Sequence, residues 1–149
     1  MGGPAFIDKD NGYRELAGIF KTNNKGPELK VGFLLESGKH EGSDTSVAQV
    51  AAYHELGAPG AGIPERSFMR SSMDENKDKI TSITKKLTRK VTNGEMNMIQ
   101  ALEVLGASLQ QMMKTKIRNG LSPALKHRKG TPLIDTGQLI NSIDYEVDK

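Results

Sequence analysis

The chain has 149 residues, a formal net charge of +3, 36% hydrophobic residues and only 5% aromatic residues. This length fits one domain with a modest core, which the composition predicts to be thin and built from Leu, Ile, Val and Met. The absence of cysteine excludes disulfides, thiolate metal sites and a cysteine nucleophile. No stretch approaches the roughly 18 apolar residues of a membrane span, and the first ten residues lack a signal-peptide pattern, so we expect a soluble protein made in the cytoplasm.

Charge is distributed unevenly along the chain. Residues 1–73 carry a net −1, residues 74–130 carry +7 and residues 131–149 carry −3. The positive middle coincides with a predicted pair of helices, so a solvated helix face is the plain interpretation. Contact with DNA passing nearby is the alternative, although few aromatic side chains that could stack on bases lie in that region.

The first half of the chain predicts a helix, a strand and a second helix. Asp10 or Asn11 can cap a short helix, and after a polar turn the apolar and polar residues alternate over 29–35, which indicates a strand. Residues 37–44 form a hydrophilic loop. Ser46 followed by Gln49 is a capping box, which predicts a helix over 47–56 that stops at a glycine.

Two short patterns in this half resemble functional motifs but lack essential parts. His54-Glu55 begins like a zinc protease helix, but Ala58 stands where the second histidine is needed. Gly38-Lys39 lacks the glycine frame of a phosphate loop and is followed by histidine. With three histidines in the whole chain, the sequence predicts no metal site and no cofactor.

The stretch after the second helix is the first candidate interface. Residues 58–63 are small and predict a flexible segment, after which a proline precedes a box with arginines around large apolar side chains. Arginine beside an apolar anchor is typical of subunit contacts, while the plain alternative is core for the apolar residues and surface for the first arginine. The candidate interface residues here are Glu55, Arg66, Phe68, Met69 and Arg70.

Two longer helices follow. Apolar residues recur at helical spacing over 80–91, with Lys and Arg facing elsewhere, and again over 96–117 up to Asn119-Gly120. Thr92 with Glu95 three residues later predicts the capping box that starts the second of these helices. We expect an antiparallel helical pair that packs across the sheet.

The C-terminal residues predict a strand that closes the domain. After an exposed basic loop over 121–130, apolar and polar residues alternate from Ser142, so that Ile143, Tyr145 and Val147 share one face. A strand needs a partner, and the strand near residue 30 is the natural one. The predicted fold is therefore a single α+β domain over 1–149, with a small antiparallel sheet packed against two longer helices and flexible loops.

Asp135-Thr136-Gly137 resembles the catalytic tripeptide of dimeric retroviral-type aspartic proteases, in which two subunits each provide one carboxylate. Such a protease needs a long run of strands after the aspartate, and only twelve residues follow Gly137. The alternative is a turn in which Asp135 accepts backbone N–H bonds and Gly137 takes a conformation that other residues avoid.

A larger part of the chain resembles tailed-bacteriophage tail-completion, neck and minor tail proteins. The resemblance is carried by an Ala-rich segment ending in a His/Glu-x-Gly box, a Pro-x-Arg-x-Phe box, a helical middle and Pro-Leu-x-Asp-Thr-Gly-x-Leu before a terminal strand. Leu56 stands where an aromatic residue is common, and Ser67 where a second proline is frequent. The matched positions are His54, Glu55, Leu56, Gly57, Pro64, Arg66, Phe68, Pro132, Leu133, Asp135, Thr136, Gly137 and Leu139.

The resemblance implies a non-enzymatic virion protein at the head-to-tail junction. It implies a homo-oligomer, a hexameric ring, that joins the connector to the tail and contacts other neck, connector and tail proteins, with DNA nearby and no membrane. It adds Leu133, Asp135 and Thr136 to the candidate interface residues. A basic nucleic-acid-binding module and the aspartic protease are the alternative functions.

Overall fold

The computed structural model describes residues 26–34, 38, 44–121 and 137–148. The predicted N-terminal helix and the basic loop up to residue 130, apart from Leu121, lie outside these residues. The helices and strands are β1 (Glu28–Phe33), α2 (Val47–Leu56), the 3-10 helix η2 (Pro59–Ala61), α3 (Met69–Glu75), α4 (Lys77–Thr92), α5 (Met98–Arg118), α6 (Gln138–Asn141) and β2 (Ile143–Asp148).

The chain closes by pairing its two distant strands, as the alternating patterns predicted. β1 and β2 form a two-stranded antiparallel sheet, in a register that runs from Glu28 opposite Asp148 to Phe33 opposite Ile143. The pleat sends alternate side chains to opposite faces, so that Ile143 is fully buried while its neighbour Asp144 is exposed. The α+β fold is thereby confirmed.

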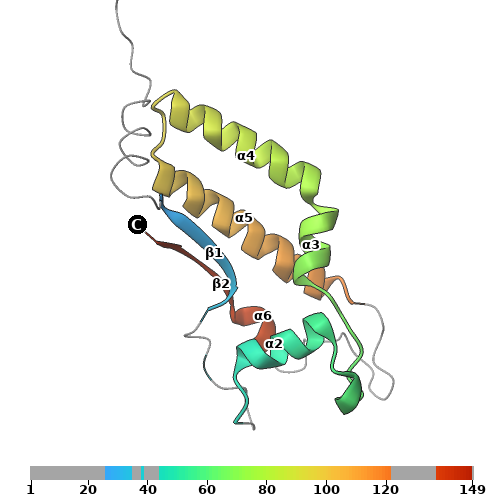
Figure 1. The fold of residues 1–149 in the computed structure, drawn as a ribbon. Coiled ribbons are helices and arrows are strands. Elements are labelled where there is room, and N and C mark those ends of the chain that lie inside the picture. The colour runs from blue at the N-terminus through green and yellow to red at the C-terminus, as the bar shows by residue number, and fades with distance from the viewer. Residues whose placement is uncertain (1–25, 35–37, 39–43, 122–136, 149) are drawn as a thin grey trace, which may run out of the picture.

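The long helices are arranged in layers beside this sheet (Figure 1). α5 contacts both strands, and α4 packs against the far side of α5. The apolar stripe of α4 is narrow: only Leu87 and Val91 are buried, and both pack onto α5. α5 instead has apolar residues on two sides, so it makes the main contact with the sheet and is the central layer of the fold.

The buried apolar residues of the described ranges form two clusters. One lies between α4 and the start of α5 around Leu87, Val91 and Ala101. The larger cluster lies where α2 and α6 meet the end of α5 and the sheet (Figure 1). Its buried members are Val47, Ala51, Phe68, Met113, Ile117, Leu121, Leu139, Ile140 and Ile143.

The capping residues were predicted correctly for α2 and wrongly for α5. The Ser46 hydroxyl accepts a bond of 3.1 Å from the Gln49 N–H, and the Gln49 side chain accepts one of 3.1 Å from the Ser46 N–H. Thr92 is the last residue of α4, and its hydroxyl donates back to a carbonyl of that helix. The box that starts α5 is formed by Asn97 and Gln100, with bonds of 2.9 and 3.0 Å, because a turn separates the two helices.

Gly106 in the middle of α5 allows the helix to lie directly on the sheet. A Cβ atom at this position would be 2.4 Å from Cδ2 of Tyr145 and 2.9 Å from Cδ1 of Leu29. Glycine inside a helix is unfavourable by roughly 1 kcal/mol relative to alanine. Here the close packing of α5 on the sheet, which only glycine permits, offsets this cost. Gln110, one turn further on, donates to the Ile143 carbonyl at 2.8 Å and ties the same helix to the start of β2.

We predict that Gly106→Ala destabilises the protein by about 1–3 kcal/mol, because the clash with the sheet outweighs the gain in helix propensity. Urea unfolding followed by circular dichroism measures the change. Gly60→Ala is the matched control, since a Cβ atom at Gly60 meets open space, and it should change stability by less than about 0.5 kcal/mol. An equally stable Gly106→Ala protein would contradict the close packing.

The two candidate caps of α5 can be separated in the same assay. Asn97→Ala should cost about 1 kcal/mol, because it removes the side-chain acceptor at the first turn of α5. Thr92→Ala should have a smaller effect, since its hydroxyl bonds an exposed carbonyl at the end of α4. A larger effect of Thr92→Ala than of Asn97→Ala would instead support Thr92 as the cap of α5, as the sequence predicted.

Candidate interface at the α2–α3 corner

The chain between α2 and α3 turns back tightly on the end of α2. Gly57 ends α2 with φ +76°, and a Cβ atom there would be 2.9 Å from the Glu65 nitrogen. Ala58 and Ile63 then form an antiparallel bridge with bonds of 2.8 and 3.1 Å around the η2 turn. The segment that the sequence predicts to be flexible, 58–63, therefore forms a turn here, in which Pro59 and two glycines allow the backbone to bond to itself.

The Glu55 carboxylate caps the next helix. It accepts hydrogen bonds from the Ser67 hydroxyl at 2.8 Å and from three consecutive backbone N–H groups at 2.7–2.9 Å. These groups belong to residues 68–70 at the start of α3, whose own N-cap residue provides no side-chain acceptor. Four N–H groups at a helix start lack partners within the helix, and a negative charge there is favourable. Glu55 therefore fixes how α3 follows α2.

These contacts perturb the ionisation of Glu55. Burial raises the pKa of its carboxyl, but the hydrogen bonds from the backbone of Arg70, Met69 and Phe68 and from the Ser67 hydroxyl outweigh burial. The net result is a pKa below the ordinary value of 4.5. The ionised form is thus the one that the folded corner stabilises.

The apolar member of the Pro-x-Arg-x-Phe box is part of the protein's own core. Phe68 is fully buried and meets the Phe33 ring of β1 edge to face, with centroids 5.9 Å apart. Arg66 is only 5% exposed, and its backbone N–H donates to the His54 carbonyl at 2.7 Å. The alternative prediction, in which Arg66 is a surface charge, is therefore wrong. Met69 is half-buried and packs on the same core. In this structure Phe68 therefore anchors the corner in the core, and a partner protein would contact other, exposed side chains.

The exposed part of the corner combines an apolar pair with an ion pair. Tyr53 and Leu56 are 48% and 69% exposed and lie one turn apart on α2. Glu65 and Arg70, the remaining candidate from this box, form an ion pair on the surface nearby. We define these four residues as the corner surface. The sequence signal for Tyr53 and Leu56 is their spacing of three, opposite the buried residues 47 and 51 of α2.

The candidates from the C-terminal box fall mostly outside the described residues. Leu133, Asp135 and Thr136 all lie there. Asp135 is also the aspartate of the protease alternative. Gly137 is described: it has φ +69° and precedes α6. The expectation that this glycine takes a conformation other residues avoid is confirmed.

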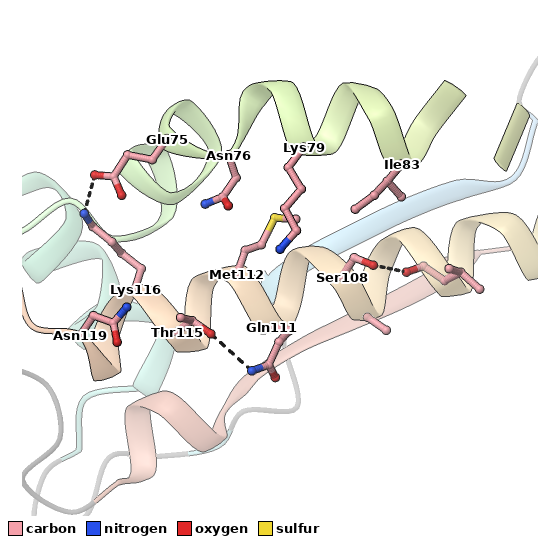
Figure 2. Close-up of a pocket in the computed structure, with 12 residues that line it drawn as sticks. Glu75, Asn76, Lys79, Ile83, Ser108, Gln111, Met112, Thr115, Lys116 and Asn119 are labelled. Carbon is pink, nitrogen blue, oxygen red and sulfur yellow. Dashed lines mark hydrogen bonds and ion pairs between the residues drawn. The ribbon is translucent and has the colours of Figure 1, made fainter. Parts of the chain in front are cut away.

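A groove of about 670 Å³ lies between the end of α3, the start of α4 and α5 (Figure 2). Lys116 and Glu75 form an ion pair at one end, and the Gln111 amide donates to the Thr115 hydroxyl at 3.3 Å. Apolar side chains also line it, and its described lining residues include no histidine. The lining residues are Glu75, Asn76, Lys79, Ile83, Val104, Ala107, Ser108, Gln111, Met112, Thr115, Lys116 and Asn119.

Within the described ranges, no three His, Cys, Asp or Glu side chains come together in a way that could hold a metal ion. The helices of that part of the chain also include none with the length and hydropathy to cross a bilayer.

Comparisons of the whole chain with protein-family models, with curated proteins and with solved structures give no match. A proposal for the function of this chain therefore rests on its sequence and on the geometry described above.

Replacing Glu55 with glutamine should destabilise the protein by about 1–3 kcal/mol at neutral pH, because a charged acceptor of four hydrogen bonds is lost. The folded-state pKa is lowered, so this contribution is fully present above the ordinary value of 4.5 and is lost as pH falls through the folded-state value. Urea unfolding at a series of pH values should show the two proteins converging as the medium becomes more acidic than pH 4.5.

Glu103→Gln is the matched control, because Glu103 is exposed on α5, and its effect should stay within about 0.5 kcal/mol. A difference between wild type and Glu55→Gln that does not depend on pH would contradict the role of the ionised carboxylate.

Proposed function

We propose that this chain is a structural, non-enzymatic component of a tailed-bacteriophage virion. It forms part of an oligomeric ring at the head-to-tail junction and contacts neck, connector and tail proteins. The proposal rests on the resemblance of the His/Glu-x-Gly, Pro-x-Arg-x-Phe and Asp-Thr-Gly boxes to that family, together with the surface that the first two boxes build.

The observation that carries the proposal is the construction of the corner surface. Glu55 uses both carboxylate oxygens to hold the start of α3, and Phe68 anchors the same segment in the core. Two large apolar side chains, Tyr53 and Leu56, are left exposed on this fixed support. Exposed aromatic and aliphatic side chains with charged residues close by are a usual composition of a protein contact site.

A second candidate function is nucleic-acid binding, favoured by the basic outer side of α4. This helix carries six basic residues and one acidic residue. Binding that depends on phosphate contacts weakens steeply with salt, so retention of duplex DNA over a range of salt concentrations distinguishes this function from a purely protein-binding role.

The virion role is tested in phage particles that carry this chain. Cross-linking and mass spectrometry of purified particles should join the corner surface to a neck, connector or tail subunit. Leu56→Asp should reduce the amount of the chain in particles by roughly tenfold or more, because burial of a leucine contributes about 1.5–3 kcal/mol.

Val104→Asp is the matched control, since Val104 is also an exposed apolar residue, at 44%, but lies on α5. It should leave incorporation near the wild-type amount. Absence of the wild-type chain from purified particles would refute the virion role, and equal losses in both variants would refute the specific part given to the corner surface.

A further inference from the structure

The outer face of the sheet carries an excess of negative charge. Leu29 and Tyr145 lie against α5, so the residues that alternate with them point away from the helix. On that side Lys30 forms an ion pair with Asp148. The hydrogen bond to Asp148, and the charges of Glu146 and Glu28, raise the pKa of the Lys30 ammonium.

One ammonium group is thus surrounded by three carboxylates, and Glu28 lies directly opposite Asp148 in the register. Like charges directly opposite each other destabilise a sheet. Among the described residues of this face Lys30 is the one cation, and it cannot neutralise all three carboxylates. A cationic partner would remove this repulsion. We call the group Glu28, Lys30, Glu146 and Asp148 the acidic face.

The outward side of α4 carries the opposite charge. Lys85, Lys86 and Arg89 are exposed and point away from the buried Leu87 and Val91. Within the described residues, no ion pair joins these three to an acidic side chain. Asp78 is the single acidic residue of the helix. We call Lys85, Lys86 and Arg89 the basic face.

The two faces lie on opposite sides of the molecule, because α5 separates the sheet from α4 (Figure 1). They cannot neutralise each other within one chain. Two copies placed in the same orientation, one behind the other, would bring the acidic face of one against the basic face of the next.

The spacing of the charges suits such a contact. Alternate residues of a strand are about 7 Å apart, and residues four apart on a helix are about 6 Å apart along its axis. The basic face extends over about 6 Å of the helix axis, from Lys85 to Arg89, and one step between alternate residues of the acidic face has about the same length. A helix laid along the sheet therefore places several ammonium and guanidinium groups against carboxylates.

We propose that the acidic face of one copy binds the basic face of α4 in a second copy of this chain. The contact uses different surfaces on the two copies, so it repeats and produces a ring if the rotation between copies closes. This inference rests on the proposed assembly function and specifies the surfaces that join the copies, whereas the corner surface remains available to other virion proteins.

Charge-reversal variants of the full-length chain test this contact. In the sheet variant, Glu28→Lys and Glu146→Lys make the acidic face basic. In the helix variant, Lys85→Glu, Lys86→Glu and Arg89→Glu make the basic face acidic. Sedimentation velocity and native mass spectrometry should show the wild type as an oligomer, and self-association of each variant alone weakened at least about tenfold by like-charge repulsion.

The decisive measurement is the mixture of the two variants. Both faces of the sheet variant are basic and both faces of the helix variant are acidic, so an equal mixture should restore an oligomer in which the two variants alternate. Raising the salt concentration should weaken the wild-type oligomer, because the screening length falls to about 3 Å at 1 M. Circular dichroism checks folding, and if a reversed protein is unfolded, the corresponding Glu→Gln or Lys→Gln set replaces it and should weaken association without rescue.

Arg118→Glu and Glu103→Lys are the matched controls, because both are exposed on α5, and they should leave the oligomer intact. A wild-type oligomer that survives both reversals would overturn the inference but not the virion role. A helix variant that loses DNA binding while its oligomer persists would overturn it in favour of nucleic acid. A strictly monomeric wild type would overturn both the inference and the ring, while the particle experiment would still decide the virion role.

Discussion

The structure depends on the close approach of α5 to the sheet at Gly106. Two strands alone are marginally stable in water, and they need a helix against one face. Here that helix can lie against the Tyr145 ring and Leu29 only because position 106 has no side chain. The strands come from opposite ends of the described chain, so this contact also holds the C-terminal residues in place. Any larger residue at 106 would separate the two layers that the rest of the fold covers.

Once α5 is fixed on the sheet, the other elements follow in sequence. α4 packs on the side of α5 that the sheet leaves open, which directs its basic residues outward. α3 leads into α4, and Glu55 of α2 determines where α3 begins. The corner surface and the two charged faces are therefore three separate regions of a molecule whose centre is one helix.

Local patterns predicted β1, β2, α2, α4 and α5 but not the short helices α3 and α6, and they could not predict long-range contacts. The alternation of apolar and polar residues revealed both strands, since a half-buried strand repeats every two residues. Ser46 with Gln49 marked the start of α2, because both residues of the capping box lie close together in sequence. Thr92 with Glu95 matches the same box and failed, since the pattern does not record that Gly94 turns the chain before α5 starts. Glu55 could not be recognised as a cap from sequence, because its partners lie up to 15 residues away on another helix. A lone glycine inside an apolar helical stripe was the available signal for Gly106.

Hydrogen–deuterium exchange of the backbone amides tests the central claim, the docking of α5 on the sheet, most directly. If α5 and the strands form one unit, the amides of β1, β2 and the middle of α5 should open with the same free energy and respond equally to urea, with those of α4 opening at lower cost. Strand amides that exchange far more readily than those around Gly106 would show that the sheet separates from the helix, and would contradict the account.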